Sequence, residues 1–423
     1  MHVFRSIELT SRRDLLLLFI TGLLFWASLA SLLPTLPLYL QSIGASRHQI
    51  GLIMGAFAVG LLLFRPWVGR LADRTDSQHG RFVRRKQVLM IGLVAATVAP
   101  LGYLLTQSMP LLALIRVFHG LSIAAFTTAY SALVVDISPQ EQRGELIGYM
   151  SLVNPIGVAI GPALGGFCLD WAGYGPLFLM ASGLGLIALL AVWGLHFVSH
   201  SGPSVEQYAT SMQQPFWRLL LSPRLRTPTV VMLLIGLAFG TLSTFVPLFI
   251  QSTRIPFNAG LFYTTAAIAS FAVRLLVGRA SDRYGRGNFI TLGILFYTAA
   301  MLFLWQAYQA QTFLLAAILE GIGAGTFIPM TIALLADRSA VQERGQVFSL
   351  GMAGFDLGIA LAGPVLGYVA DAVGYRGLFG IATGLCLLAL VIFTTQINKT
   401  LVRSLRFALG SSEDDYASLS KTA

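Results

Sequence analysis

Four ionisable side chains lie deep within long apolar segments of the sequence: Arg116, His119, Glu320 and Asp356. An ionised side chain at the centre of a bilayer costs about 2.5–3.5 kcal/mol on the insertion scale, so such residues usually face a wet cavity and pair. An apolar environment disfavours the charged form of a carboxyl group, and reversible protonation requires a group of this kind. Glu320 is therefore our first candidate for a side chain that binds and releases a proton.

The other three residues each have a second interpretation. Arg116 can be a fixed structural cation that binds backbone carbonyls. His119 can be a neutral hydrogen-bonding residue as readily as a proton carrier. Asp356 can take the role of Glu320, or it can simply bind a neighbouring helix. An internal repeat, described below, aligns His119 with Glu320, and a glycine follows each of them.

The segments that carry these residues are long enough to cross a membrane. Of the 423 residues, 56% are hydrophobic and only 11% are charged, which leaves too little polar surface for a water-soluble domain. A helix needs about 20 apolar residues to span a bilayer. Twelve stretches qualify, centred near residues 28, 59, 97, 122, 157, 186, 239, 269, 298, 323, 357 and 386. The sequence predicts an all-α membrane protein with twelve transmembrane helices.

A polar stretch divides these helices into two sets of six. We expect an N-terminal six-helix bundle over 1–198, a cytoplasmic linker loop over 199–225 and a C-terminal six-helix bundle over 226–398. The polar tail over 399–423 is expected to be disordered. The apolar run after Arg13 contains no small-residue cleavage pattern, so we interpret it as a retained span and not as a signal peptide.

The basic residues indicate the orientation. If both termini are cytoplasmic, only Arg47, Arg254 and Arg376 lie outside, three other arginines lie within spans, and the remaining basic residues are cytoplasmic. The net charge of +10 is then a topology signal that suits anionic lipid headgroups, and it does not indicate nucleic acid. We predict a multi-pass protein of the cell (inner or plasma) membrane with both termini in the cytoplasm.

The two halves of the sequence repeat each other. RPWVGRLADR at 65–74 matches RLLVGRASDR at 274–283, with six of ten positions identical. ALVVDISPQEQRG at 132–144 likewise matches ALLADRSAVQERG at 333–345. Further matches lie at the ends of the first and fifth predicted helices of each half. The two six-helix copies therefore have the same orientation. Parallel repeats of six helices are typical of transporters that bind their substrate between the halves.

On these motifs the chain resembles the major facilitator superfamily over essentially its whole length. The motif G-x-x-x-D-R-x-G-R after the eighth helix carries the resemblance, with Gly278, Asp282, Arg283, Gly285 and Arg286. The first copy retains Asp73 and Arg74, but five residues (TDSQH) precede Gly80 where the family usually has one. This insertion leaves the contacts of Gly80 and Arg81 open.

Two further stretches resemble motifs of the drug/proton antiporters of that family. LIRVFHGLSIAA at 114–125 fits the pattern R-x-x-Q-G with His119 in place of the glutamine. GVAIGPALGG at 157–166 fits the antiporter motif of the fifth helix. The resemblance implies a proton-coupled transporter, and neither motif addresses the substrate.

The glycine-rich motif also has a simple structural interpretation. Glycines spaced by four residues let two helices approach closely, and a proline permits a bend. We expect this packing role for Gly157, Gly161, Pro162 and Gly165, and for Gly363 and Pro364 in the second half.

The resemblance implies a cytoplasmic gate at the repeated basic motif. Asp73, Arg74, Asp282 and Arg283 would form a latch of ion pairs and helix dipoles that holds the cytoplasmic side shut. Arg143 and Arg344, each seven residues after an aspartate, would be the partners. The alternative is that these charges only fix the depth of the helices in the membrane.

Aromatic residues on the presumed cavity helices could stack against an amphipathic substrate, although such residues more often pack helices together. They are Trp26, Phe126, Tyr130, Phe239 and Phe327. The first predicted helix contains no acid between Leu15 and Tyr39, which argues against cationic substrates.

Together these features favour a proton-coupled antiporter that exports a small amphipathic compound or metabolite. A proton-coupled uptake permease for a sugar, organic acid or other nutrient remains the alternative. The sequence shows no nucleophile–base set, phosphate loop or metal cluster, which argues against an enzyme. Cys168 and Cys386 lie far apart in apolar segments and predict neither a disulfide nor a metal site. We expect no cofactor, a small-molecule substrate, protons and lipid as partners, and a monomer.

Overall fold

The computed structural model describes residues 9–72, 78–138, 142–196, 222–339 and 344–417, and within these ranges the chain is helical with no strand. The predicted all-α fold is therefore confirmed. The first half contains α1 (Leu9–Ser42), α2 (Arg47–Ala72), α3 (Gln78–Leu105), α4 (Met109–Ile137), α5 (Arg143–Ser151), α6 (Val153–Ala172) and α7 (Tyr174–Trp193). The second half contains α9 (Pro223–Thr253), α10 (Ala259–Tyr284), α11 (Arg286–Trp305), α12 (Ala310–Asp337), α13 (Arg344–Gln396) and α14 (Leu401–Ala408).

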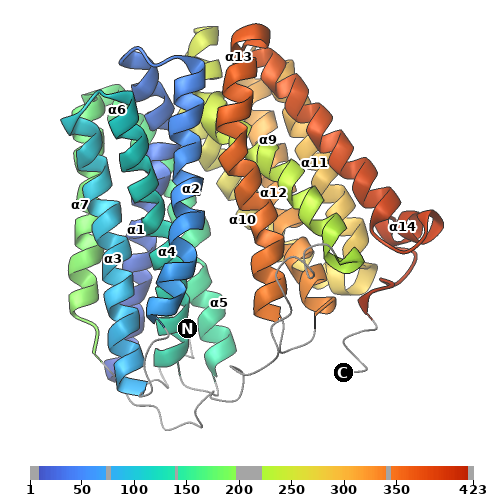
Figure 1. Cartoon of the computed structure of the whole chain (residues 1–423), viewed down its shortest axis with the longest axis horizontal. Helices are drawn as coiled ribbons and strands as arrows, with labels where there is room; N and C mark the ends of the chain where they lie inside the picture. The colour runs from blue at the N-terminus through green and yellow to red at the C-terminus, as the bar shows by residue number, and fades with distance from the viewer. Residues whose placement is uncertain (1–8, 73–77, 139–141, 197–221, 340–343, 418–423) are drawn as a thin grey trace. The chain divides into compact units, whose positions relative to one another are not determined.

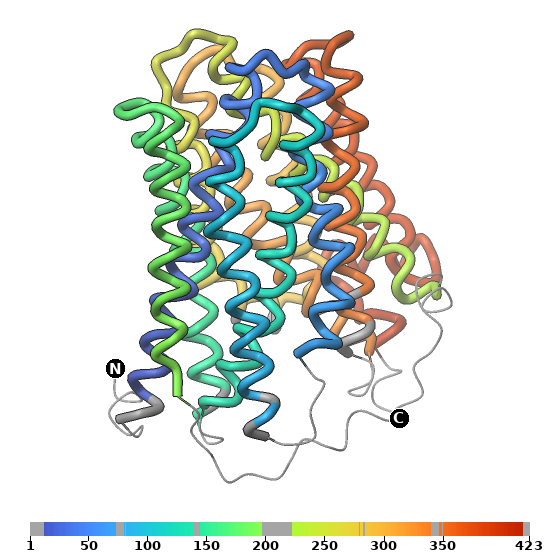
Figure 2. Tube along the Cα trace, turned by 60° about the vertical axis from the view of Figure 1, so that its left-hand side comes forward, coloured from blue at the N-terminus to red at the C-terminus, as the bar shows by residue number. Residues whose placement is uncertain are grey.

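The chain divides into two compact units. Unit 1 comprises Met1–Pro203 with Asn258–Thr264, and unit 2 comprises Ser204–Phe257 with Thr265–Ala423. Within each unit the long helices run side by side along their length (Figure 1, Figure 2).

In unit 1, α1 packs against α6 and α7, and α4 packs against α2 and α3. The interior is apolar, with Leu18 and Phe25 of α1 and Phe126 and Leu133 of α4 at 1% exposure or less. Apolar residues surround most of these helices, as expected for helices that face a bundle on one side and lipid on the other.

In unit 2, α9 packs against α13, and α11 packs against α12 and α13. Gly374 interrupts α13 with φ 71° and ψ 172°, a backbone conformation that glycine adopts without steric cost. At the matching position of the repeat, Gly173 separates α6 from α7 with φ 83°. A glycine at the matching position of each half therefore turns the chain between the fifth and sixth spans.

Eleven described helical segments are long and apolar enough to cross a membrane. The last, Leu350–Gln396, has 47 residues and passes through the kink at Gly374. At 1.5 Å per residue it is about 70 Å long, more than twice the ~30 Å of hydrocarbon that one helix has to span. Counted as two spans, it completes the twelve that the sequence predicts.

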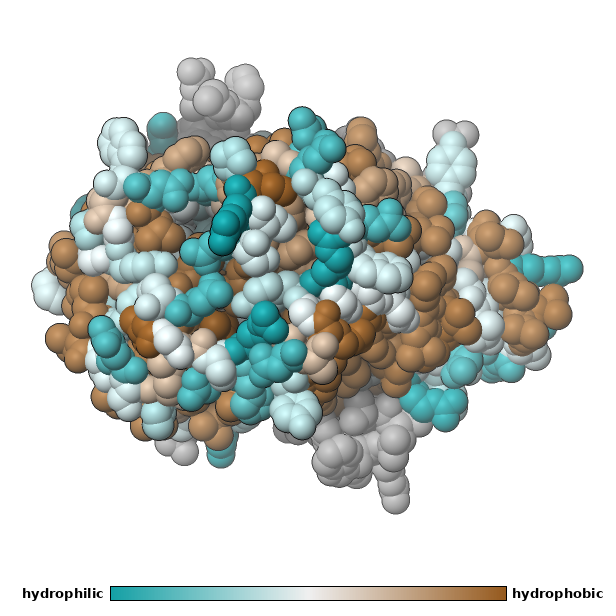
Figure 3. Space-filling model, turned by 90° about the horizontal axis from the view of Figure 1, so that it is seen from above, coloured by the Kyte–Doolittle hydropathy of each residue, from teal (hydrophilic) through white to brown (hydrophobic). Residues whose placement is uncertain are grey.

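Large hydrophobic side chains are exposed along the described spans, among them Leu63, Leu114, Leu276 and Val391. Such faces are stable when lipid covers them. Figure 3 looks onto one end of the helices, where hydrophilic residues gather while hydrophobic residues lie along the edge of the view. This distribution matches helices that cross a bilayer and end in water.

The prediction of a disordered tail is wrong for residues 401–417. Leu401–Ala408 form α14, which packs against α11 and α13, and the described chain continues beyond it to Ala417. Polar composition suggested disorder, but Asp414 and Asp415 both form ion pairs within unit 2. These pairs hold the polar segment in place.

Candidate functional site

Glu320 lies in the interior of unit 2 and accepts a hydrogen bond from Tyr297. The Tyr297 hydroxyl of α11 is 3.1 Å from Glu320 Oε1, and both side chains are buried. No lysine, arginine or histidine among the described residues lies within 4.0 Å of the carboxylate. A carboxyl group with a neutral donor and no cation can hold a proton in place of a counter-ion.

Two glycines bring the helices together at this point. A Cβ atom at Gly323 would lie 2.9 Å from the Tyr297 backbone nitrogen, and one at Gly321 would overlap the Ala266 carbonyl of α10. Because these positions lack side chains, α12 lies directly against α10 and α11. Close packing thus holds the Tyr297 ring beside Glu320, about 15 Å along α12 from its first residue.

The matching position in unit 1, His119, has a different environment. Its Nδ1 lies 3.0 Å from the Tyr103 hydroxyl and 3.3 Å from Arg116 Nη1. The guanidinium can only donate, so Nδ1 is the acceptor and the ring carries its proton on Nε2. Protonation of Nδ1 would remove this acceptor and place a second cation beside Arg116. His119 is therefore held as a neutral ring.

Arg116 lies over the ring of Phe57, with Cζ 4.4 Å from the ring centroid. Its Nε atom is buried and has no hydrogen-bond partner among the residues described. Its described partners are thus His119 and two aromatic residues, and the expected contacts with backbone carbonyls are not seen. Cation–π contact supplies part of the stabilisation that water would otherwise give to the guanidinium.

Asp356, the second carboxylate candidate, is buried in α13. Gly354 and Gly358 on either side of it pack against the backbone of α9, at Thr229 and Leu233. Asp356 therefore lies near the contact of two helices, where either interpretation from the sequence still applies.

The aromatic candidates lie largely in packed interiors. Phe126 stacks between Phe25, with ring centroids 3.8 Å apart, and Tyr130, at 4.9 Å. Phe327 is fully buried and packs beside Gly293. Trp26 and Phe239 are half-buried and make edge or tilted contacts with other rings. The contacts of Phe126 and Phe327 favour helix packing as their role.

The glycines of α6 face α1. A Cβ atom at Gly157 would lie 2.5 Å from the Trp26 Cβ, one at Gly161 would lie 2.6 Å from the Ala27 carbonyl oxygen, and one at Gly165 would overlap the Ser31 carbonyl. Pro162 lies within the same helix. In unit 2, Gly363 is buried in α13, and Pro364 follows it.

The structure does not describe the side chains of the expected gate. Asp73 and Arg74 lie outside the described residues. Asp282 and Arg283 belong to the last turn of α10, while Arg143 and Arg344 begin α5 and α13. Their side chains are not among those described, so the expected latch remains a prediction.

The structure shows two ion pairs that the sequence did not suggest. Arg85 of α3 contacts Asp136 of α4 at 2.7 Å, and Arg286 of α11 contacts Asp337 of α12 at 2.9 Å. The four residues occupy matching positions of the repeat. In both halves the arginine precedes the aspartate by 51 residues, and this spacing is the signal for the pairing. Alignment on the aspartates, and not on the glycines, would have found it.

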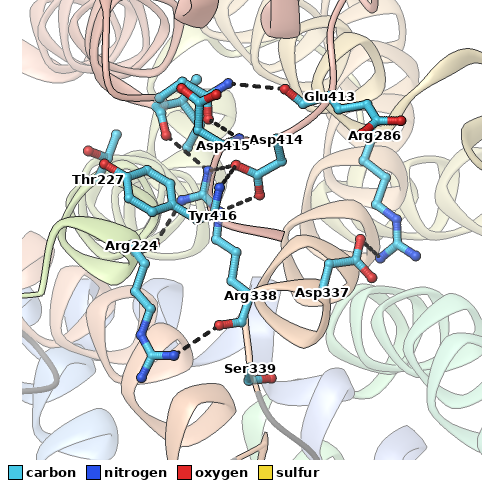
Figure 4. A network of polar contacts seen from close by, with 12 residues as sticks. Arg224, Thr227, Arg286, Asp337, Arg338, Ser339, Glu413, Asp414, Asp415 and Tyr416 are labelled. Atoms are coloured by element: carbon cyan, nitrogen blue, oxygen red, sulfur yellow. Dashed lines mark hydrogen bonds and ion pairs between the residues drawn. The ribbon is translucent and has the colours of Figure 1, made fainter. Parts of the chain in front are cut away.

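Sequence reasoning also missed a buried cation at the end of α12. Arg338 is fully buried and donates hydrogen bonds to Asp414, to the Arg224 carbonyl at 2.7 Å and to the Ile397 carbonyl at 2.9 Å. The ring of Tyr416 lies 4.9 Å from its Cζ (Figure 4). This network joins the ends of α9, α12 and α13 to the tail.

Among the described residues, no group of three or more histidine, cysteine, aspartate or glutamate side chains could hold a metal ion. Buried in the described interior are the carboxyl groups of Glu320 and Asp356 and the guanidinium of Arg116.

Comparison with known proteins identifies the family. The sequence profile of the Major Facilitator Superfamily matches residues 18–307 and 256–407. The staphylopine export protein of Staphylococcus aureus (strain Mu50 / ATCC 700699) is 26% identical over 385 residues, which cover 89% of this chain and 94% of that protein. A homologue of the multi-drug resistance efflux pump PmrA from Lactococcus lactis subsp. lactis (strain IL1403) is 24% identical over 378 residues, covering 86% and 90%.

Solved structures share the fold. The nucleoside transporter NupG superimposes with a TM-score of 0.73 at 14% identity, covering 89% of this chain and 97% of that one. At this identity the likeness concerns the fold alone. The profile matches both halves, the described helices supply the twelve spans, and relatives over nearly the whole length are exporters. The chain belongs to the Major Facilitator Superfamily and is a multi-pass membrane transporter, not an enzyme.

Proposed function

We propose that this protein is a proton-coupled antiporter that exports a small amphipathic compound or metabolite. The observation that carries the proposal is the environment of Glu320, which is buried, hydrogen-bonded to the neutral Tyr297 hydroxyl and without a described cation within 4.0 Å. Such a carboxyl group can alternate between a protonated and an ionised form as its access to water changes.

The contact of His119 with Arg116 supports different roles for the two halves. His119 serves as acceptor for the fixed charge of Arg116, so unit 1 supplies a permanent cation in place of a titrating group. Unit 2 then carries the exchangeable proton at Glu320, with Asp356 as the alternative carrier. The names of the relatives, an export protein and an efflux pump, support the outward direction.

The ion pairs Arg85–Asp136 and Arg286–Asp337 fit a gate at the basic ends of the helices. Under this proposal these ends are cytoplasmic, as the distribution of basic residues predicts. Asp73, Arg74, Asp282, Arg283, Arg143 and Arg344 would take part in the same latch. Partly exposed pairs of this kind can break and form again in each transport cycle.

Proton movement in response to substrate is the decisive measurement. The protein is reconstituted into liposomes that contain a trapped pH-sensitive dye, and a panel of neutral, anionic and cationic amphipathic compounds is added in turn. An antiporter moves protons opposite to a transported compound, so the lumen changes pH only with substrates. Protons that move in the same direction as the compound would instead identify an uptake permease. Substrate movement with no pH change would reject proton coupling.

A further inference from the structure

The short helix α14 presents three different faces. Successive residues of a helix are rotated by about 100°, so Leu401, Val402 and Leu405 share one arc, which Leu409, the residue directly after the helix, continues. These four side chains are 54%, 60%, 42% and 69% exposed. A second arc is buried against unit 2, and Arg403 and Arg406 lie between the two arcs. The helix therefore carries an apolar face that no described part of unit 2 covers.

The buried arc fixes the depth of α14 relative to the spans. The Phe407 ring contacts that of Phe393, with centroids 6.4 Å apart, and Phe393 lies in the last turn of the span that ends at Gln396. The Ala408 carbonyl accepts a 2.9 Å hydrogen bond from Thr291, in the second turn of the span that begins at Arg286. α14 thus lies within about two helical turns of two span ends, at the level of the membrane surface.

Basic side chains flank the apolar face. Arg406 is exposed, and no described carboxylate lies within 4.0 Å of it. Lys399, just before the helix, is exposed as well, and its Nζ lies 5.8 Å from the Tyr416 ring centroid. Arg403 differs, because its guanidinium already contacts Asp415 at 2.7 Å. Two cations therefore remain available at the level of the lipid phosphates.

We propose that α14 is an interfacial helix whose leucine face inserts into the adjacent leaflet while Arg406 and Lys399 bind the phosphates of anionic phospholipids. An amphipathic helix with basic residues beside an apolar arc binds an anionic membrane surface in this manner. The preceding span already holds α14 at the surface, so binding incurs little further loss of translational freedom. This proposal is independent of the direction of transport and of the ion that drives it.

The position of the apolar face is tested with a fluorescent probe on a single cysteine. Cys168 and Cys386 are first replaced by serine and alanine, and Leu405→Cys or Leu409→Cys is labelled in the full-length protein in nanodiscs. Lipids brominated near the headgroup should quench these probes, and aqueous iodide should quench them little. Leu388→Cys, exposed within the span, is the lipid-facing control, and Glu413→Cys in the exposed tail is the aqueous control.

Two results would overturn the proposal. Iodide quenching at Leu405 as strong as at Glu413 would place the face in water. Protection from both iodide and brominated lipid would mean that a protein, such as a second copy of this chain, covers it.

The preference for anionic lipid is measured with the same probe. Nanodiscs contain phosphatidylglycerol and phosphatidylcholine in equal amounts, with the bromine on one lipid or on the other. Quenching at Leu405 should report an enrichment of phosphatidylglycerol, and Arg406→Gln should reduce this enrichment by about fivefold, the contribution of one basic residue at an anionic surface. Arg254→Gln, exposed at the far end of α9, is the matched control and should leave the enrichment unchanged. Equal quenching by both lipids in the unmodified helix would reject the anionic-lipid site.

Discussion

Asp414 receives two hydrogen bonds from Arg338, 76 positions earlier in the sequence, at 2.6 Å from Nε and 2.8 Å from Nη2. The Arg338 side chain is fully buried, whereas most arginines keep their charge in water. A buried cation is tolerated only when its charge and its donors are paired. The polar tail is therefore part of the fold of unit 2, because it supplies the carboxylate.

Removal of that carboxylate should destabilise the protein strongly. Asp414→Ala leaves Arg338 buried and unpaired, at a cost of about 3–5 kcal/mol. The expected result is a clear fall in the melting temperature of the purified protein in detergent. The comparison variant is Arg403→Ala, which removes an arginine that is 62% exposed. It leaves Asp415, at 9% exposure, with the backbone N–H of Lys399 as a donor, so the fall should be smaller. Similar falls in the two variants would contradict the structural role of Asp414.

The transport role of Glu320 is tested by Glu320→Gln. The amide still accepts a hydrogen bond from Tyr297 but cannot exchange a proton. Transport driven by a pH gradient should collapse, while binding of substrate and exchange of substrate for substrate survive. Asp356→Asn is the parallel variant. If the Glu320→Gln variant still transports substrate at the wild-type rate in response to a pH gradient and the Asp356→Asn variant does not, Asp356 is the proton carrier.

The sequence predicted the spans and the depth of Glu320 because both depend on local composition. A run of 20 apolar residues is a helix in lipid whatever surrounds it, and a single acid within such a run stands out. The Arg338–Asp414 pair could not be predicted this way. Both residues look like ordinary charged residues at helix ends and in a polar tail, and their contact exists only once three helix ends converge. The pairing of Asp136 with Arg85 was missed for a similar reason, since the two residues lie 51 positions apart on different helices.

His119 should be replaceable by a residue that accepts the same hydrogen bonds. In His119→Gln the amide oxygen can accept from Arg116 and Tyr103, so proton-coupled transport should remain within about a factor of three of the wild type. His119→Leu removes the acceptor that the buried Tyr103 hydroxyl and the Arg116 guanidinium share, and it should cost about 1–3 kcal/mol of stability, seen as a lower melting temperature. If His119→Gln folds normally but no longer responds to a pH gradient, His119 itself carries the proton.

The paired charges at the helix ends should affect the rate of the cycle more than the stability. Arg85 and Asp136 are 18% and 27% exposed, and pairs at such positions contribute up to about 1 kcal/mol. Asp136→Asn should therefore change the rate of substrate exchange by about two- to fivefold and leave the melting temperature nearly unchanged. The reversed pair, Arg85→Asp with Asp136→Arg, should restore part of the rate. An exchange rate unaffected by Asp136→Asn would argue against a gate at this position.

The contact between α1 and α6 makes a prediction that separates close packing from the general cost of glycine. A Cβ atom at Gly165 would overlap the backbone carbonyl of Ser31, and a backbone atom cannot rotate out of the way as a side chain can. Gly148 in α5 has no heavy atom within 4 Å of its Cβ position. Alanine favours a helix over glycine by about 0.5–1 kcal/mol, so Gly148→Ala should leave the melting temperature unchanged or raise it. Gly165→Ala makes the same chemical change, yet it should lower the melting temperature and the folded yield because α6 has to move away from α1. If the two variants behave alike, the Gly157, Gly161 and Gly165 motif does not serve to bring these helices together, and a role in transport would become the better explanation of its presence.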